Sequence, residues 1–353
     1  MSEFTNLREA VDSLAHSAAP LDLAALERRA VRRGRRRVVL IAAATAAVIA
    51  GSTATVAGLG DDRTAPPLEQ PQTTKSPVLT KPLIAPESLL DVRELGFHVE
   101  PVDGVEVGDS WGVDLDGQWT SVVLHAPGSP RLTYVKVLYQ GRTPEPLTGT
   151  SEDVTVNGLP GTYTENVESG LFTARLSWQY APDSWAEVGI SGDGQPPPDT
   201  RQQYLKVAEA VRAGGEAVRV PVRFDSAPAS LPAIAKAHRI DFGGDDGDWT
   251  IYVWLDDAMV SATTAVDLGE CLGDGGERQT GEFTYRGFRG CVVPNGTQQR
   301  IGLHLDGVDV TYDFDPGAEL PREDIKRLLA GVTVAPPSYD PTRWFDLKTA
   351  LGG

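Results

Sequence analysis

Two stretches of the chain are near copies of each other: residues 116–124 read DGQWTSVVL, and residues 246–254 read DGDWTIYVW, at an offset of 130. A second pair follows at an offset of 129, with TVNGLPGTY at 155–163 and TYRGFRGCV at 284–292. Two matches at nearly one offset indicate an internal duplication. We therefore expect two related domains of ordinary size, residues 85–220 and 221–335.

Alternating apolar and polar residues predict antiparallel strands within each copy. In residues 172–180, FTARLSWQY, every second side chain is apolar, as a strand with one buried face requires. Residues 301–305 and 308–315 alternate in the same way around a turn at 306–307, which predicts a hairpin. Thr200 with Gln203 three residues later is typical of a capping box at a helix start. The expected fold class is α+β, with a short helix, antiparallel strands and a closing helix in each copy.

An apolar run with an arginine block in front of it precedes the duplicated region. Residues 38–60 carry no charge, and a helix of that length covers the roughly 30 Å hydrocarbon core of a bilayer. Positive residues stay on the cytoplasmic side, which predicts a single-pass membrane protein with residues 1–37 inside and the bulk of the chain extracytoplasmic. A secretory signal cleaved after TVA at 55–57 is the alternative. The membrane-flanking arginines are Arg28, Arg29, Arg32, Arg33, Arg35, Arg36 and Arg37.

The remaining segments outside the two copies are short. Residues 61–84 are rich in proline and predict an extended linker, and residues 336–353 predict a carboxyl-terminal tail with a short helix. Apolar residues at helical spacing in 5–19 predict a helix that lies on the membrane surface or binds a cytoplasmic protein. The net charge of −17 argues against nucleic acid as a partner.

The two cysteines, Cys271 and Cys291, both fall in the region expected to be outside the membrane. An even number of cysteines in that compartment predicts a disulfide. Two free buried thiols are the alternative.

Aromatic residues provide the candidate ligand face. Trp119 and Trp249 occupy the same position in the two copies and are expected in the core. Trp185, Tyr252 and Trp254 alternate away from the apolar side of their strands, so they are candidates for contacting a ligand, such as a sugar ring or an apolar chain. Burial under a helix or against the other copy is the alternative.

Catalytic and metal-binding patterns are weak. Ser110 lies in VGDSWG, similar to the Gly-Asp-Ser block of some esterases, but no histidine has the Asp-x-x-His spacing that such a serine needs. Asp245, Asp246 and Asp248 could bind calcium, although a hairpin turn explains them better. We therefore expect a protein without catalytic residues, metal or cofactor.

Several motifs resemble known bacterial proteins. The order VTVNGLPGTYTE, ARLSWQY, SWAEVGISG and YLKVAEAVR, within 154–212, resembles the carboxyl-terminal halves of extracytoplasmic domains in anti-sigma regulators and lipoprotein carriers. The layout LREAVDSLA, then PLDLAALERRAVRRGRRR, then the alanine-rich run resembles uncharacterised single-pass membrane proteins of actinobacteria. The expected function is a membrane-anchored extracytoplasmic module that binds or senses an envelope ligand without catalysis. A transmembrane regulator acting through residues 5–19, and an envelope hydrolase, are the alternatives.

Overall fold

The computed structural model of the protein is mostly β: 58% of its described residues lie in strands and 14% in helices. The expected α+β class is therefore wrong, because the short helix expected at the start of each copy is a single 3-10 turn. These turns are η1 (Leu89–Asp91) and η2 (Ile234–Lys236). The structure describes residues 76–125, 130–168, 171–193, 199–225, 227–228, 230–231, 234–245, 248–256, 258–264, 281–295, 298–305, 307–315, 321–335 and 341–352.

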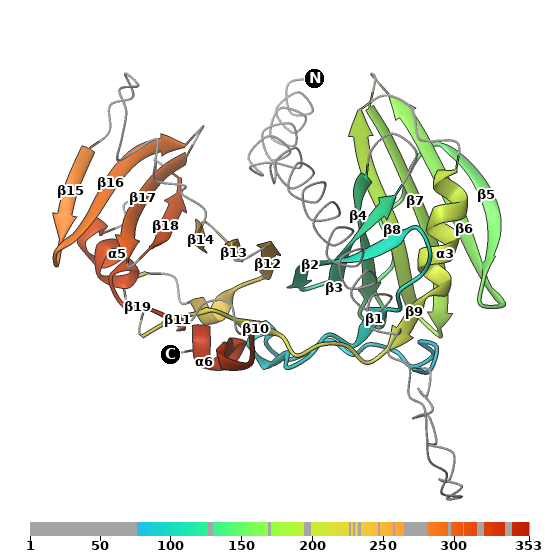
Figure 1. The fold of residues 1–353 in the computed structure, drawn as a ribbon, viewed down its shortest axis with the longest axis horizontal. Helices are drawn as coiled ribbons and strands as arrows, with labels where there is room; N and C mark the ends of the chain where they lie inside the picture. Colours follow the sequence, from blue (N-terminus) through green and yellow to red (C-terminus); the bar gives the residue numbers. More distant parts are fainter. Residues whose placement is uncertain are drawn as a thin grey trace, which may run out of the picture.

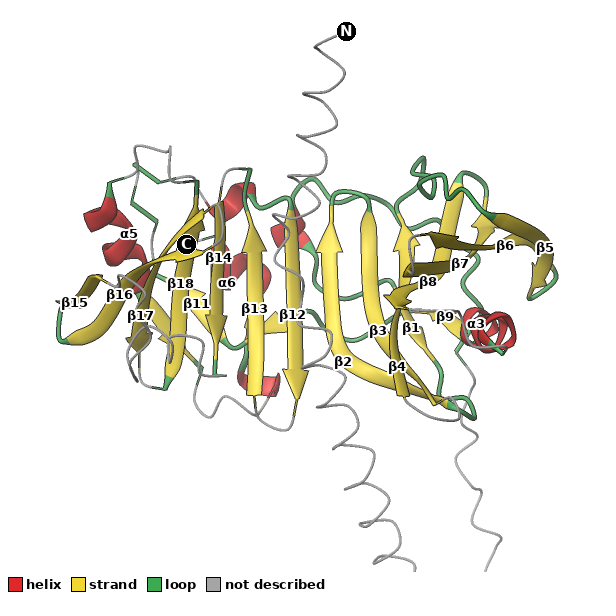
Figure 2. Cartoon of the chain, turned by 90° about the horizontal axis from the view of Figure 1, so that it is seen from above, coloured by secondary structure: helices red, strands yellow, loops and turns green. Residues whose placement is uncertain are grey.

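One antiparallel sheet of 14 strands runs through the whole molecule (Figures 1 and 2). The sheet consists of two halves, with strands β2 to β8 in the first and β12 to β18 in the second. Both halves have the same order outward from the centre, in which the first three strands of the half are followed by its seventh, sixth, fifth and fourth. In spatial order the strands are β15 (Gly281–Tyr285), β16 (Phe288–Asn295), β17 (Gln298–Leu305), β18 (Val308–Phe314), β14 (Ala258–Thr263), β13 (Asp248–Trp254), β12 (Arg239–Asp245), β2 (Val105–Asp114), β3 (Gly117–His125), β4 (Pro130–Leu138), β8 (Ser184–Asp193), β7 (Leu171–Ala181), β6 (Leu159–Glu168) and β5 (Thr150–Val156).

Short helices and two-stranded ribbons complete the described fold. Helix α3 follows β8, α5 follows β18, and α6 lies near the carboxyl terminus. Their bounds are α3 (Thr200–Glu209), α5 (Arg322–Leu329), α6 (Leu347–Leu351) and the 3-10 turn η3 (Pro341–Arg343). The ribbons pair β1 (Phe97–Val99) with β9 (Val211–Ala213), β11 (Val222–Phe224) with β19 (Val332–Val334), and β10 (Arg219–Val220) with β20 (Phe345–Asp346).

Each half also begins with an equivalent Pro-Val segment. The backbone N–H of Ala213 donates to the carbonyl of Pro77 at 3.0 Å, and that of Ala335 donates to the carbonyl of Pro221 at 2.7 Å. Leu79, two residues after Pro77, is buried in the first core. The folded first half therefore includes residues that the sequence predicts as linker.

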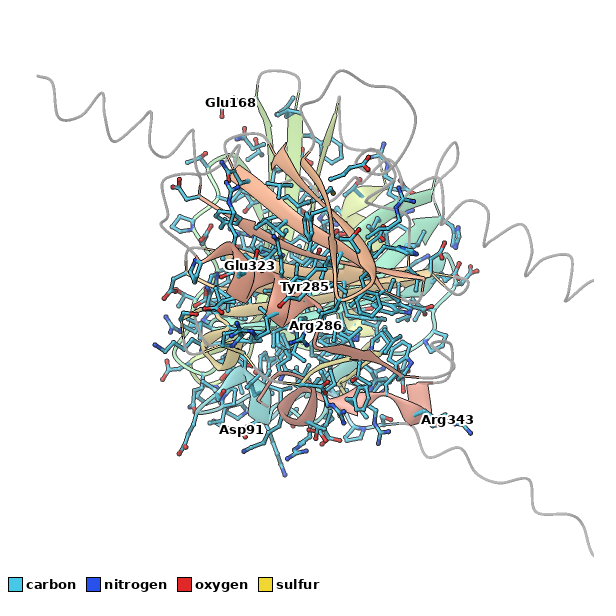
Figure 3. The ribbon with its side chains drawn as sticks, turned by 90° about the vertical axis from the view of Figure 1, so that its left-hand side faces the viewer. Asp91, Glu168, Tyr285, Arg286, Glu323 and Arg343 are labelled. Atoms are coloured by element: carbon cyan, nitrogen blue, oxygen red, sulfur yellow. The ribbon has the colours of Figure 1, made fainter. Side chains whose placement is uncertain are left out.

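The second pair of repeated motifs occupies the same turn in both halves. Asn157 and Gly158 connect β5 to β6 with φ of 50° and 81°, and Arg286 and Gly287 connect β15 to β16 with φ of 51° and 89°. Two successive left-handed residues are the signature of a type I′ hairpin turn. Figure 3 labels Arg286 beside Tyr285, whose ring centroid lies 5.6 Å from the guanidinium carbon.

The first pair of repeated motifs is shifted by one residue between the halves. Asp245 pairs with Asp248 across the β12–β13 hairpin, whereas Val113 pairs with Gln118 across the β2–β3 hairpin. By these pairs, Gln118 and not Trp119 is the equivalent of Trp249. A shift of one residue moves a side chain to the opposite face of a sheet. Trp249 is 3% exposed in the core, but Trp119 lies on the other face, so its predicted core position is wrong.

Two hydrophobic clusters share one face of the sheet. The first cluster consists of first-half residues only, and α3 covers it by packing on β7 and β8. The second cluster lies under α5 and α6 and also contains residues from the start of the first half. Those residues are Leu89, Leu90, Val92 and Leu95, and Val113 of β2 belongs to the same cluster. Both halves therefore build this second cluster, which we call the central core.

The halves join through their first strands, β2 and β12. Four antiparallel pairs make this junction, from Arg239 with Asp114 to Phe242 with Trp111. Trp111 stacks on Phe242 with ring centroids 5.7 Å apart and an interplanar angle of 22°. Antiparallel pairing of equivalent strands relates the halves by an approximate two-fold axis at this pair. In Figure 1 the two halves turn up on either side of β12 and β2.

No helix in the described part of the chain is long and apolar enough to cross a membrane. The longest, α3, has 10 residues. This finding stands against the single-pass location expected from the sequence. The predicted inside segment 1–37, the predicted anchor 38–60, the helix in 5–19 and the arginines from Arg28 to Arg37 lie outside the described residues.

Candidate functional site

The face of the sheet opposite the two cores is polar, and its centre carries the candidate site. We call the following residues, on the five strands β12, β13, β2, β3 and β4 around the junction, the central face: Asp114, Trp119, Lys136, Arg239, Asp241, Tyr252 and Trp254. They lie on this side because strand residues alternate between the two faces, and buried apolar residues of the same strands, such as Ile240, Val253 and Val137, lie in the cores.

Cross-strand pairing aligns four of these residues in one row. Trp119 pairs with Lys136 on one side and with Gly112 on the other. Gly112 pairs in turn with Asp241, and Asp241 pairs with Tyr252. The row therefore crosses the junction between the halves without interruption.

Asp241 is the most buried member of the central face, with 3% of its surface exposed. Its Oδ2 accepts a hydrogen bond from Arg239 Nε at 2.7 Å and another from Trp254 Nε1 at 3.2 Å. Its Oδ1 has no solvent-accessible surface and lies beside the indole nitrogen of Trp119 next to Gly112. Burial raises the pKa of the Asp241 carboxyl above its ordinary value, and the Arg239 charge with the hydrogen bonds from Arg239, Trp254 and Trp119 counteracts this only in part.

Gly112 leaves the space in which Asp241 and Trp119 meet. A Cβ atom at Gly112 would lie 2.1 Å from Trp119 Nε1 and 2.5 Å from Asp241 Oδ1. The absent side chain thus allows the indole of Trp119 to fold over β2 toward the carboxylate of β12. The central face depends on this close approach.

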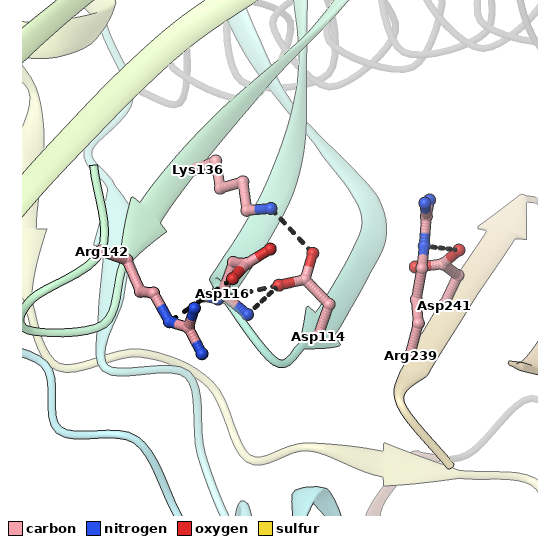
Figure 4. Close-up of polar contacts among 7 residues, drawn as sticks. Asp114, Asp116, Lys136, Arg142, Arg239 and Asp241 are labelled. Carbon is pink, nitrogen blue, oxygen red and sulfur yellow. Dashed lines mark hydrogen bonds and ion pairs between the residues drawn. The ribbon is translucent and has the colours of Figure 1, made fainter. Parts of the chain in front are cut away.

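A second acid–base pair lies on the first-half side of the junction (Figure 4). Lys136 Nζ is 2.8 Å from Asp114 Oδ2, and both side chains are less than a fifth exposed. Asp114 Oδ1 accepts the backbone N–H groups of Asp116 and Gly117 at 2.8 Å each, which closes the β2–β3 turn. The acids of the central face, Asp114 and Asp241, each have a basic partner.

The outer part of the polar face in the first half is covered by the connection from β4 to β5. Arg175 on β7 donates to the carbonyl oxygen of Glu145 in this connection and lies 3.7 Å from Glu187 on β8. Burial raises the pKa of Glu187, and the charge of Arg175 lowers it less. The central face lies inward of this covered region.

The structure brings together two of the three predicted ligand-face residues. The rings of Tyr252 and Trp254 lie side by side on β13 with centroids 6.4 Å apart, and the Arg239 guanidinium lies 5.7 Å from the centroid of Trp254. Trp185 is on β8 of the same face, but four strands separate it from β13. At about 4.8 Å per strand spacing, that is about 24 Å along the sheet.

Trp119 and Asp241 are the site residues that sequence reasoning missed. The repeated motifs align without a gap, so they give no indication of the one-residue shift between the two hairpins. Asp241 belongs to an acidic stretch that resembles a turn, and only the pairing of β12 with β2 buries it.

The predicted cysteine pair is only half described. Cys291 lies on β16, fully buried, and is not a free thiol. Cys271 lies outside the described residues. The predicted bond between Cys271 and Cys291 reaches outside the described residues, and no disulfide lies wholly within the described part.

The other candidates predicted from the sequence lack the partner groups that their predicted chemistry would need. The hydrogen bonds described at Ser110 use its backbone: its N–H donates to Ser121 Oγ, and its carbonyl accepts from Thr120 Oγ1. No described hydrogen bond joins its hydroxyl to a histidine. Asp245 and Asp248 pair at the end of a hairpin, and Asp246 lies outside the described residues. No group of three or more His, Cys, Asp or Glu side chains that could hold a metal occurs where the structure is described.

A scan of protein-family models finds none that matches the chain, and a search of curated proteins finds no match either. The geometry of the site is therefore the basis for its function.

Proposed function

We propose that this protein is a non-catalytic binding module that takes its ligand on the central face. The observation that carries the proposal is the pair of partly exposed rings of Tyr252 and Trp254, which lie 6.4 Å apart beside the exposed side of Arg239. Partly exposed aromatic rings on a polar face are typical of surfaces that contact a ligand.

The neighbours of Asp241 support binding over catalysis. Its two oxygens lie against Arg239 and aromatic rings, and the described contacts include no hydroxyl or thiol that it could activate. Aromatic side chains with polar tips are typical of recognition surfaces. No observation in the described residues favours the regulator that would act through residues 5–19.

Ligand-induced stabilisation tests this proposal. A ligand at 100 times its Kd stabilises a protein by about 2.7 kcal/mol, so thermal unfolding can screen neutral sugars, charged sugars, fatty acids and peptides. We expect at least one class to raise the Tm of the wild type and of Trp185→Phe by several degrees, but not that of Trp254→Phe. If no class does so, or if Trp254→Phe responds fully, ligand binding on the central face is refuted.

A further inference from the structure

We infer that the carboxyl-terminal segment, residues 341–352, is a docked peptide, and that the groove which holds it binds the same peptide when it is supplied as a separate molecule. The segment contains η3, β20 and α6. It packs on the core side of the sheet at the junction of the halves, beside β10 (Figure 1). This interaction surface lies on the opposite side of the sheet from the central face, so the inference does not depend on the proposed function.

Elements from both halves form the groove. Helix α6 contacts η1 at the start of the first half, β10 at its end and β11 at the start of the second half. Strand β20 pairs with β10. Phe242 of β12 adds an aromatic wall, since its ring centroid lies 5.2 Å from that of Trp344. The segment thus occupies a surface that exists only where the two halves meet.

The segment is an addition to the duplicated fold. Strand β19, which precedes it, corresponds to β9 of the first half, because each pairs with the first ribbon strand of its half. After β9 the chain continues into β10, which is one wall of the groove. The described backbone pairing between the segment and the rest of the chain is confined to Arg219 with Asp346 and Val220 with Phe345. Attachment of the segment therefore depends mainly on its side chains.

The helix of the segment is capped by residues of the segment itself. Asp346 is the N-cap of α6: its Oδ1 accepts the backbone N–H of Thr349 at 3.0 Å, and its Oδ2 accepts Thr349 Oγ1 at 3.0 Å. At the other end, the backbone N–H of Gly352 donates to the carbonyl of Lys348 at 2.8 Å. Caps of this kind stabilise a helix end. A separate peptide of this sequence therefore brings the caps that its bound form needs.

Apolar side chains on one side of α6 provide the main contact with the groove. Leu347 and Ala350 are fully buried, and Leu351 is 4% exposed. All three belong to the central core together with Leu89 and Leu90. Apolar residues at positions i, i+3 and i+4 are the usual anchors of a helical peptide in a groove. The segment therefore has the anchor pattern of a peptide ligand.

Ion pairs at the rim of the groove fix the direction of the segment. Lys348 Nζ lies 2.9 Å from Asp91 Oδ1, and Asp346 Oδ1 lies 3.3 Å from Arg93 Nη1. The segment contributes the base to one pair and the acid to the other, so a reversed peptide would place like charges opposite each other. Exposed pairs contribute little to affinity, but they contribute to the choice of partner and its orientation.

Attachment to the chain keeps the groove occupied by its own segment. A peptide joined through a short linker has an effective concentration in the millimolar range. A separate peptide at micromolar concentration therefore does not displace it from the intact chain. Cutting the chain between β19 and the segment removes this advantage, and a separate peptide can then exchange with the cut segment.

Peptide exchange on the cut protein tests the inference. A protease recognition site is inserted after Pro337 of the full-length protein, and the chain is cut after it has folded. The probe is a fluorescein-labelled peptide of residues 341–353, and fluorescence anisotropy measures its binding to the cut and to the uncut protein. Two peptide variants are compared: Leu347→Ala removes a buried anchor, and Lys348→Ala is the matched control at the exposed neighbouring position.

We expect the labelled peptide to bind the cut protein saturably, to be displaced by unlabelled peptide, and not to bind the uncut protein. Leu347→Ala should weaken binding by about 30-fold or more, as expected for the loss of a buried leucine side chain. Lys348→Ala should weaken it by less than about fivefold, because it removes only an exposed ion pair. Circular dichroism before and after cutting shows whether the protein stays folded.

Other results overturn the inference. If the peptide does not exchange into the folded cut protein, the segment is a permanent part of the central core. If the protein unfolds as soon as the chain is cut, the segment is integral to the fold and is not a docked peptide. If the Leu347→Ala peptide binds as tightly as the unchanged peptide, or if the uncut protein binds the probe equally well, the peptide binds elsewhere. None of these results bears on the central face, which the stability screen tests separately.

Discussion

Gly112 is the residue on which the geometry of the central face depends. It lies between Trp119 and Asp241 in the cross-strand row, and the space of its missing Cβ is filled by their polar atoms. A residue without a side chain thus allows two halves of the molecule to share one polar cluster. Its contribution is steric, since its φ is not in the left-handed region.

Replacing Gly112 by alanine should destabilise the protein. The added methyl would lie 2.1 Å from Trp119 Nε1 and 2.5 Å from Asp241 Oδ1, and overpacking of this kind costs about 1–3 kcal/mol. Gly243→Ala on β12 is the matched control, because its nearest neighbour would be Ser110 Oγ at 3.4 Å. Urea unfolding measures both variants, and equal stability of the two would contradict the steric role of Gly112.

Asp241 should make stability depend on pH. Burial raises its folded-state pKa above the unfolded value of about 3.9, so folding takes up a proton between the two. The contribution of this carboxyl to stability therefore falls as pH rises through that window and is constant above the folded-state pKa. Asp241→Asn removes this dependence.

The difference in free energy of unfolding between wild type and Asp241→Asn, measured from pH 4 to pH 8, checks this prediction. The difference should shift in favour of the variant as pH rises. A constant difference, or a shift in favour of the wild type, would show that the carboxyl is not destabilised by burial.

Among the elements, the two equivalent turns differ in how well their residues suit the backbone. Both turns need left-handed residues at two positions, and the first half has Asn157 where the second has Arg286. Asparagine tolerates this conformation better than arginine because its short polar side chain bonds locally. The β15–β16 hairpin therefore carries backbone strain that the β5–β6 hairpin lacks.

Exchanging these two residues should have opposite effects on stability. Arg286→Asn should stabilise the protein by about 0.5 kcal/mol after loss of the Arg286 contact with Tyr285, and Asn157→Arg should destabilise it by about 1 kcal/mol. Thermal unfolding of the two single variants measures this. Effects of the same sign would mean that the two turns are not equivalent.

In the whole molecule, the two halves share a topology, but only the first half has a core made of its own residues alone. The first core is composed entirely of residues from 79 to 211. The central core needs η1 of the first half, which packs on α6 and is bridged to it by Lys348 and Asp91 at 2.9 Å. Removing the first half would therefore remove part of the core of the second.

Fragments of the chain should show this asymmetry. We expect residues 221–352 alone to lack cooperative unfolding, because the apolar side chains of Leu89, Leu90, Val92 and Leu95 are missing from their core. Residues 76–220 should retain cooperative unfolding, because their main core is intact. Calorimetry measures whether each fragment unfolds cooperatively. If residues 221–352 unfolded cooperatively and residues 76–220 did not, the shared central core would be contradicted.

A single substitution tests the same point in the full chain. Leu347 is fully buried in α6, so Leu347→Ala should destabilise the protein by about 2–5 kcal/mol. Leu171→Ala, at a side chain 57% exposed, should cost almost nothing. Chemical unfolding of the two variants distinguishes a closed central core from a loosely attached carboxyl-terminal tail.

Local patterns in the sequence determined the strands, the hairpins and the turns of this protein. The alternation in 172–180 placed Leu176 and Trp178 in the first core, and the Gly307 turn joins β17 to β18 as expected. These features depend on residues close to one another in the chain, so a short stretch contains the information that specifies them.

The tertiary structure alone decided how the two halves meet and where the site lies. The junction of β2 with β12 buries Asp241, and the one-residue shift between hairpins moves Trp119 to the polar face while Trp249 stays in the core. The paired strands lie about 130 residues apart in the chain, and a shift of one residue in their register moves every side chain to the opposite face. No short stretch of sequence specifies either feature. The central face exists because of that pairing.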